Sequence, residues 1–252
     1  MSGTVRSDAV ESALFPASAD DVRRLIDHAI LKPELDRAAV DTQLDEAATH
    51  RVLSVCVRPG DVRHAVERLT GTGVGVGTVI GFPHGTTTTS TKTAEARQAI
   101  ADGAFELDMV QQIGAAKSGD WAAVEADVRA VVEVAGDVPV KVILETAFLT
   151  DEEIVAACHA AVRAGASFVK TSTGFAGGGA TEDHIRLMRA TVGPDVGVKA
   201  SGGVRGLDAV IAMVAAGADR IGTSASARIM DEYAHRARTG AASGLGDDTS
   251  SY

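Results

Sequence analysis

Two lysines in this sequence follow the same local pattern, and that pattern suits amine chemistry. Lys170 ends the largely apolar run 166–169 and precedes Thr-Ser-Thr-Gly, while Lys199 ends the run 196–198 and precedes Ala-Ser-Gly-Gly. A free lysine has a pKa of about 10.4, so at neutral pH its protonated amine cannot attack a carbonyl. A second cation nearby and partial removal from water both favour the neutral amine. If the two lysines end adjacent strands, one of them is predicted to form a Schiff base.

A carboxylate lies inside another apolar run. Asp108 stands within Phe-Glu-Leu-Asp-Met-Val, and a buried carboxylate is costly unless it is paired or takes part in chemistry. Two interpretations stay open for Asp108. Either it forms an ion pair with a lysine and only stabilises the interior, or it also moves protons for the reactive amine.

Small and hydroxyl-bearing residues follow three of the later apolar runs. The candidate anion-binding residues are Thr173, Gly174, Gly202, Gly203 and Ser224. Glycine turns let backbone N–H groups approach an anion near a helix N-terminus. Each turn alone could merely end a strand, but together they predict a phosphate site and hence a phosphorylated substrate.

Eight apolar runs of strand length alternate with amphipathic segments. The predicted strands are Arg24–Ile30, Val52–Val57, Gly75–Ile80, Phe105–Val110, Val138–Leu144, Phe168–Thr171, Val196–Lys199 and Arg220–Thr223. The clearest predicted helix is Asp151–Ala164, where Thr150 and Glu153 match a capping box. Such alternation indicates a parallel sheet covered on both faces, and eight units predict a single-domain (β/α)8 barrel.

An open, doubly wound sheet is the alternative architecture. The glycines of 71–77 precede a strand without the G-x-G-x-x-G spacing of a dinucleotide site, which disfavours it. In a barrel, the carboxyl ends of the strands form the active face. The polar residues expected at those ends are Asp27, Cys56, His84, Asp108, Glu145, Lys170, Lys199 and Ser224. Asp27 and Cys56 are therefore candidate substrate contacts, with a plain core role as the alternative for Cys56.

Composition limits the other possibilities. The chain has 252 residues and a formal net charge of −10, which disfavours sequence-independent binding to nucleic acid. No run approaches the ~20 apolar residues of a membrane span, and the first residues lack a signal core. We expect a cytoplasmic protein with small-molecule partners, and homo-oligomerisation stays open. The expected division is an N-terminal extension with partial disorder (1–20), the barrel (21–238) and a flexible C-terminal tail (239–252).

The sequence resembles the deoxyribose-phosphate aldolases of the Schiff-base class, the class I aldolases, over most of its length. The matching segments are 26–28 (Ile-Asp-His), 31–33 (Leu-Lys-Pro), 55–57 (Val-Cys-Val), 81–85 (Gly-Phe-Pro-His-Gly), 106–108 (Glu-Leu-Asp), 141–146 (Lys-Val-Ile-Leu-Glu-Thr), 169–174 (Val-Lys-Thr-Ser-Thr-Gly), 199–205 (Lys-Ala-Ser-Gly-Gly-Val-Arg) and 251–252 (Ser-Tyr). Two residues depart from the pattern. Phe175 stands where some members have a lysine, and Ala29 stands where a threonine is frequent.

The resemblance implies a reaction and roles for four residues. The reaction is reversible cleavage of 2-deoxy-D-ribose 5-phosphate into D-glyceraldehyde 3-phosphate and acetaldehyde. Lys170 would form the imine, Lys199 would tune it, and Asp108 would manage protons through water. The final Tyr252 would assist proton transfer at the imine carbon, although on composition the tail reads as a disordered end.

No metal or other cofactor is expected, because the iminium nitrogen itself accepts the electrons. Metal-dependent aldolases need several histidine ligands around one ion, and of seven histidines only His28 and His84 come near predicted strand ends. Two rival classes remain at this point: an isomerase that uses Asp108 and a lysine without a covalent imine, and a phosphosugar-binding protein without chemistry.

Overall fold

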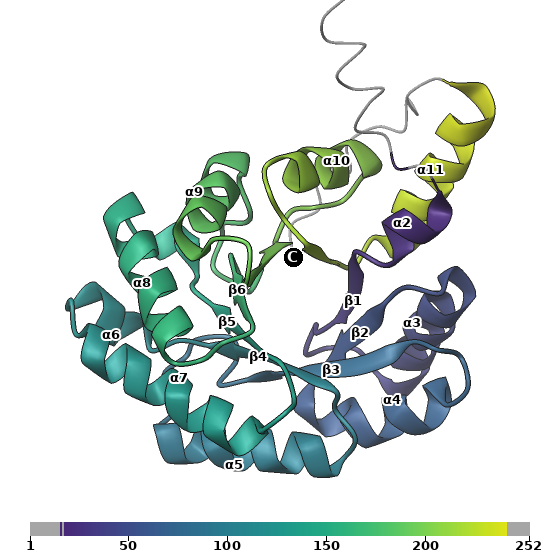
Figure 1. The fold of residues 1–252 in the computed structure, drawn as a ribbon. Coiled ribbons are helices and arrows are strands. Elements are labelled where there is room, and N and C mark those ends of the chain that lie inside the picture. The colour runs from purple at the N-terminus through teal and green to yellow at the C-terminus, as the bar shows by residue number, and fades with distance from the viewer. Residues whose placement is uncertain (1–15, 17, 241–252) are drawn as a thin grey trace, which may run out of the picture.

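Eight parallel strands close into a barrel in the computed structural model, which describes residues 16 and 18–240 (Figure 1). The strands are β1 (Ile26–Ile30), β2 (Ser54–Val57), β3 (Gly75–Ile80), β4 (Glu106–Val110), β5 (Val140–Ile143), β6 (Phe168–Lys170), β7 (Gly197–Ser201) and β8 (Arg220–Thr223). They follow one another in sequence order, and β8 pairs with β1 to close the sheet. The predicted (β/α)8 barrel is confirmed, and the open-sheet alternative is wrong.

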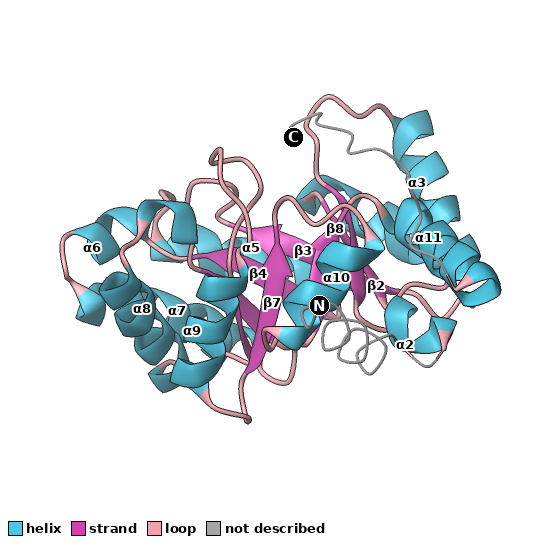
Figure 2. Cartoon of the chain, turned by 90° about the horizontal axis from the view of Figure 1, so that it is seen from above, coloured by secondary structure: helices cyan, strands magenta, loops and turns pink. Residues whose placement is uncertain are grey.

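Helices surround the strands, as the view from above in Figure 2 shows. They are α2 (Ala19–Arg23), α3 (Arg37–His50), α4 (Val62–Leu69), α5 (Thr89–Ala101), α6 (Ile113–Lys117), α7 (Trp121–Ala135), α8 (Asp151–Arg163), α9 (Glu182–Val192), α10 (Leu207–Ala215) and α11 (Ser226–Thr239), with short 3₁₀ turns at Pro59–Asp61 and Thr146–Phe148. None of the helices described here is long and apolar enough to cross a membrane.

All eight predicted strands are present, with small differences at their ends. The capping box predicted before α8 is also confirmed: the Thr150 hydroxyl accepts from the Glu153 amide at 3.3 Å, and Glu153 accepts from the Thr150 amide at 2.8 Å. Of the expected N-terminal extension (1–20) and C-terminal tail (239–252), residues 1–15, 17 and 241–252 lie outside the described residues.

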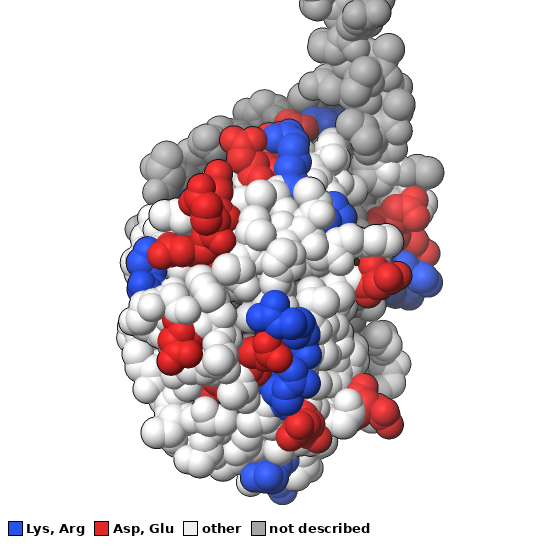
Figure 3. Space-filling model, turned by 60° about the vertical axis from the view of Figure 1, so that its left-hand side comes forward, with Lys and Arg blue, Asp and Glu red and all other residues white. Residues whose placement is uncertain are grey.

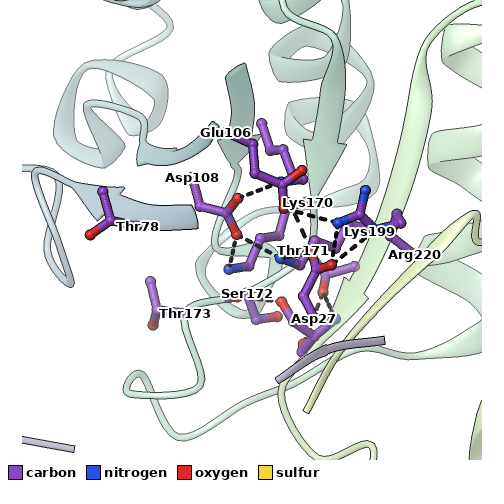
Figure 4. Close-up of polar contacts among 12 residues, drawn as sticks. Asp27, Thr78, Glu106, Asp108, Lys170, Thr171, Ser172, Thr173, Lys199 and Arg220 are labelled. Carbon is purple, nitrogen blue, oxygen red and sulfur yellow. Dashed lines mark hydrogen bonds and ion pairs between the residues drawn. The ribbon is translucent and has the colours of Figure 1, made fainter. Parts of the chain in front are cut away.

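Successive side chains of β4 point alternately into the apolar layer under the helices and into the barrel. Leu107 and Met109 are fully buried in the apolar layer that the strands share with the helices. Glu106 and Asp108 are on the opposite face and point into the barrel (Figure 4). Because neighbouring residues of a strand face opposite sides, an apolar outer face and a charged inner face can share one short segment.

The surface carries charges of both signs. On the face shown in Figure 3, basic and acidic side chains lie next to one another in small groups between uncharged areas. Surface ion pairs of this kind include Glu125 with Arg129 at 2.6 Å and with Arg163 at 2.7 Å. The visible described surface on this side therefore presents no continuous basic stripe.

One ion pair outside the barrel is completely buried. Lys92 of α5 donates to the Val110 carbonyl at 2.8 Å and to Asp127 of α7 at 2.6 Å, and both side chains are inaccessible to solvent. Burial lowers the pKa of Lys92, while Asp127 opposes that shift. The pair joins two helices to the carboxyl end of β4.

We expect Lys92→Met to lower the free energy of unfolding by about 3–5 kcal/mol, because Asp127 would stay buried without its cation. The double variant Lys92→Met/Asp127→Asn should lose clearly less, since it removes the uncompensated charge. Denaturant unfolding of the parent and both variants measures this. Equal losses in the single and double variants would contradict the prediction.

Candidate active site

Three lysines surround one carboxylate inside the barrel, and Figure 4 labels two of them, Lys170 and Lys199. Asp108 of β4 accepts from Lys170 of β6 at 2.7 Å and from Lys199 of β7 at 2.8 Å through Oδ2. Its other oxygen, Oδ1, accepts from Lys141 of β5 at 3.0 Å. The strand register causes this convergence, because Asp108 pairs with Lys141 across β4 and β5, and Lys170 pairs with Lys199 across β6 and β7.

A second group of charges lies beside the first. Asp27 of β1 is 2.5 Å from the Nζ atom of Lys199 and forms a close ion pair with Arg220 of β8. Glu106 of β4 joins the same group, at 2.7 Å from the Nζ atom of Lys141 and 2.9 Å from the Nη2 atom of Arg220. All these contacts link the two groups into one buried network.

The network keeps Asp27 and Asp108 ionised. Burial alone would raise the pKa of Asp108, but its three lysine partners outweigh burial and hold that pKa well below the ordinary value. Burial also opposes ionisation of Asp27, yet Lys199, Lys141 and Arg220 together lower its pKa. Asp108 is therefore an anion at neutral pH, and ion pairs between Asp108 and lysines, which both interpretations include, are present.

The same attraction keeps Lys199 charged. Burial disfavours its cation, but Asp108 and Asp27 raise its pKa above the ordinary value. Lys199 therefore supplies the fixed positive charge next to Lys170 that the sequence predicts.

A pocket opens over these groups. Its lining consists of Asp27, Ala29, Leu31, Cys56, Lys170, Thr173, Lys199, Ser201, Gly202 and Gly222. One wall is apolar, where Leu31, Cys56 and Val79 pack together with Ala29 and Phe82. The pocket thus places amines and a carboxylate beside a surface suited to a small hydrocarbon group.

Asp27 and Cys56, the two candidate substrate contacts, both line the pocket, but one expectation about Asp27 is corrected. Asp27 was expected at the carboxyl end of its strand, and this is wrong: it is the second residue of β1. It still reaches the pocket, because its side chain points inward to Lys199. Burial raises the pKa of Cys56 to about 12, so this residue is a neutral thiol in the apolar wall.

The candidate phosphate residues lie in loops after the last three strands. Thr173 and Gly202 line the pocket, Gly174 is half-buried, and Gly203 and Ser224 are exposed. The loops after β6 and β7 touch: the Ala180 amide donates to the Gly202 carbonyl at 3.0 Å. The loop after β8 joins them, since Thr223 at its start donates to the Val204 carbonyl at 2.6 Å.

Gly202 is required where these loops meet. Its φ of +86° is in the left-handed region, and a Cβ atom there would lie 2.9 Å from the Cα of Gly179. Any larger residue would therefore be strained and would also push the two loops apart.

Some residues of the site received no role from the sequence. Lys141, Glu106 and Arg220 are members of the buried network, and Glu145, considered only as a strand-end residue, fixes the loop after β6. Its carboxylate accepts from the Thr173 amide at 3.2 Å and forms a short hydrogen bond with the Thr173 hydroxyl. The signal available for Glu106 was its place two residues before Asp108, on the same face of the strand.

Two other residues considered above, Phe175 and His84, are not members of the network. Tyr252 is outside the described residues. Phe175 packs its ring against Phe82, with centroids 5.3 Å apart, and His84 is exposed in the loop after β3. Across the described part of the chain, no group of three or more His, Cys, Asp or Glu side chains is placed to hold a metal ion.

A barrel with lysine amines at its pocket is typical of enzymes that act on carbonyl compounds through an amine. The sequence model of the DeoC/LacD family of aldolases matches residues 22–247, and the chain belongs to this family. The family expected from the sequence is thereby confirmed. It makes the protein a lyase, of the class that forms a Schiff base.

The chain is also similar in sequence to proteins of known name, which support its place in this aldolase family. A deoxyribose-phosphate aldolase from Streptococcus mutans is 55% identical over 210 residues, covering 83% of this chain and 96% of that protein. One from Brevibacillus brevis is 53% identical over 210 residues, covering 83% and 95%.

Two solved structures share the barrel fold. The tetrameric deoxyribose phosphate aldolase from Aeropyrum pernix matches with a TM-score of 0.83 and 30% identity, covering 92% of this chain and 99% of that one. A dihydrodipicolinate synthase from Bacillus anthracis matches with a TM-score of 0.63 and 14% identity, covering 86% and 75%, and shares the fold alone.

His28 connects the first strand to the loop that follows the last. Its Nδ1 atom is 2.7 Å from the hydroxyl of Ser226, the first residue of α11, which begins two residues after Ser224. Burial lowers the pKa of His28 to about 4, with His50 adding to the shift and Gln43 opposing it. His28 is therefore neutral in the folded protein at neutral pH.

Stability should fall as the pH drops from about 6.5, the pKa of an unperturbed histidine, towards about 4. In that window the unfolded chain takes up a proton and the folded chain does not, a cost of roughly 3 kcal/mol in total. Chemical unfolding at several pH values should show this slope in the parent and less of it in His28→Gln. Identical slopes would show that His28 is not responsible.

Proposed function

We propose that this protein reversibly cleaves 2-deoxy-D-ribose 5-phosphate into D-glyceraldehyde 3-phosphate and acetaldehyde through a Schiff base on Lys170. The observation that carries the proposal is the placement of this amine. Lys170 lines the pocket, and its Nζ atom shares one carboxylate oxygen of Asp108 with the cationic Lys199. The names of the relatives supply the substrate.

The amine begins the reaction. In the cleavage direction, neutral Lys170 attacks the C1 aldehyde of the open-chain sugar, and loss of water gives an iminium ion. The C2–C3 bond then breaks as the C3 hydroxyl loses its proton, and the bonding electrons move towards the iminium nitrogen. The products are D-glyceraldehyde 3-phosphate and an enamine, which takes up a proton at carbon and releases acetaldehyde by hydrolysis.

Neighbouring groups have distinct roles in this scheme. Lys199, held charged by Asp27 and Asp108, favours the neutral form of the adjacent amine. Asp108 is ionised, so it orients the amines and accepts protons only transiently, through water. The apolar wall of Leu31 and Cys56 suits the two-carbon end of the substrate, which becomes acetaldehyde.

The phosphate lies at the other end of the pocket in this proposal. Thr173, Gly174, Gly202, Gly203 and Ser224 would hold it, since their three loops are joined by the hydrogen bonds described above. Backbone amides of glycine loops are suited to an anion, and this end of a barrel commonly binds phosphate. In the described part of the chain, Phe175 contributes an aromatic ring rather than a cation beside this group.

The proposal also covers cofactors, partners, cellular location and assembly. The barrel at 21–238 would carry the activity without a metal or other cofactor, and its partners would be small molecules rather than nucleic acid or membrane. We infer a cytoplasmic location and assembly into a homo-oligomer, the latter by analogy with the tetrameric relative.

Borohydride reduction during incubation with acetaldehyde should leave a stable adduct on the peptide that contains Lys170, because only an imine is reduced to a permanent bond. Peptide mapping by mass spectrometry measures it. Lys170→Ala should lower turnover by roughly 10⁴-fold or more, as loss of a covalent nucleophile does, while the thermal unfolding of the variant stays cooperative.

The control is Lys117→Ala, which removes a lysine that is 44% exposed and remote from the pocket. This variant should keep both adduct and turnover. An adduct on Lys199 would overturn the assignment of the nucleophile. Absence of any adduct would favour an isomerase or a binding protein on the same barrel.

Deletion of Tyr252 tests the proposed proton carrier. The trapped imine on Lys170 should persist, while turnover falls and the methyl protons of acetaldehyde exchange more slowly with deuterated water. Imine formation needs only Lys170, Lys199 and Asp108, whereas enamine formation also needs a proton carrier at the methyl carbon. NMR measures the exchange. Parent-rate exchange would mean that the carrier is near Asp108 instead.

A further inference from the structure

The buried network has an unequal number of charges. Its cations are Lys141, Lys170, Lys199 and Arg220, and its carboxylates are Asp27, Glu106 and Asp108. With every group ionised, one positive charge is left over. Excess charge is costly away from water, so the network becomes neutral when one lysine loses its proton.

The contacts decide which lysine this is. Lys199 is held by two carboxylates, Asp27 at 2.5 Å and Asp108 at 2.8 Å. Lys141 is held by Glu106 at 2.7 Å and Asp108 at 3.0 Å. Lys170 has a single carboxylate partner within ion-pair distance, Asp108, and shares that oxygen with Lys199. Deprotonation of Lys170 therefore sacrifices the fewest ion pairs.

Arg220 is one of the four cations of the network, but it does not line the pocket at which Lys170 lies. It is the first residue of β8, at the amino end of the barrel. It makes ion pairs with Asp27 and Glu106, and within the described residues it forms no ion pair with Asp108. Its guanidinium stays charged, because Asp27 and Glu106 outweigh burial and raise its pKa above the ordinary value.

An aromatic ring helps to isolate this layer. The ring of Phe168 lies 5.8 Å from the Nζ atom of Lys141 and 5.9 Å from the Cζ atom of Arg220. It also covers Gly197, where a Cβ atom would lie 2.1 Å from the ring. Fewer water molecules can reach charges packed in this way, so they act on one another over a longer range.

We propose that Arg220 and Glu106 are positioning residues that set the charge of the network and thereby the proton occupancy of Lys170. The charge of Arg220 promotes proton loss from Lys170, and the charge of Glu106 opposes it. The inference rests on the proposed role of Lys170 as the imine-forming amine. It assigns a function to two side chains that do not line the pocket and that form no hydrogen bond with the amine within the described residues.

The other groups that face Lys170 do not change this balance. From β2, Cys56 is a neutral thiol, and β3 contains no titratable side chain. Glu145, after β5, acts on Lys170 only from beyond ion-pair distance, and its carboxylate is satisfied by Thr173. Burial raises the pKa of Glu145, which weakens its competition further.

The test is the pH dependence of imine formation in charge variants. Parent, Arg220→Met, Glu106→Gln and the double variant are incubated briefly with acetaldehyde between about pH 5 and pH 10 and quenched with borohydride. The adduct on the Lys170 peptide is then measured. Arg220→Met should move the midpoint of this profile up by about one pH unit and Glu106→Gln should move it down by a similar amount, as expected for one unit charge acting through a protein interior.

The double variant restores the charge balance, so its midpoint should return close to that of the parent. Arg63→Met is the control for net charge, because Arg63 is 70% exposed, and its midpoint should stay unchanged. A purely structural role would lower the rate at all pH values without opposite shifts. Midpoints that do not move, or that move in the same direction, would overturn the inference.

If a variant does not fold, a measurement on the parent protein still tests the inference. NMR titration of the ¹⁵N-labelled lysine side chains should show that Lys170 loses its proton at a lower pH than Lys141 and Lys199. Earlier loss by either of the others would overturn the inference. An adduct on Lys170 with unshifted midpoints would refute this inference alone, whereas no adduct in the parent at any pH would refute the proposed function as well.

Discussion

The attraction between the Asp108 carboxylate and three lysine ammonium groups is the interaction on which the rest of the site depends. Removing one charge from water costs several kcal/mol, and only close partners can compensate. The barrel supplies them from three consecutive strands, β5, β6 and β7, with Nζ atoms 2.7 to 3.0 Å from the carboxylate. A barrel interior is ordinarily filled by branched apolar side chains. Here part of that space holds charged groups, which are stable because each lies within ion-pair distance of an opposite charge.

The network has two ends with different surroundings. Towards the carboxyl ends of the strands, Lys170 meets a pocket with an apolar wall. Towards the amino ends, the ring of Phe168 lies 5.9 Å from the Cζ atom of Arg220, which is paired with Glu106 at 2.9 Å. Because the charges are joined without interruption between these ends, a change at the closed end alters the electrostatic potential at the open one. In the proposed function, the amine of Lys170 would therefore depend on two side chains, Arg220 and Glu106, that do not line the pocket.

The loops after β6 and β7 provide backbone groups at the mouth of the barrel, which the charged side chains inside the barrel do not provide. Glu145 fixes the chain directly after β6 through the amide and hydroxyl of Thr173. Gly202 lets the loops after β6 and β7 approach each other. Together they hold backbone groups in place at one end of the pocket, while the amine and its apolar wall form the other. A substrate with a carbonyl at one end and a phosphate at the other fits this division.

The sequence alone determined the strands, the alternation with helices and three central residues, Lys170, Lys199 and Asp108. Apolar runs interrupted by charge are visible without coordinates, because strand periodicity and the cost of burial act locally. It did not determine that Asp27 is near the start of β1, or that Arg220 completes the network. Which inward-facing side chains meet depends on strand register and on closure between β8 and β1, which join residues almost two hundred positions apart in the chain. Only the tertiary structure settles such distances, and with them the balance of charge around the amine.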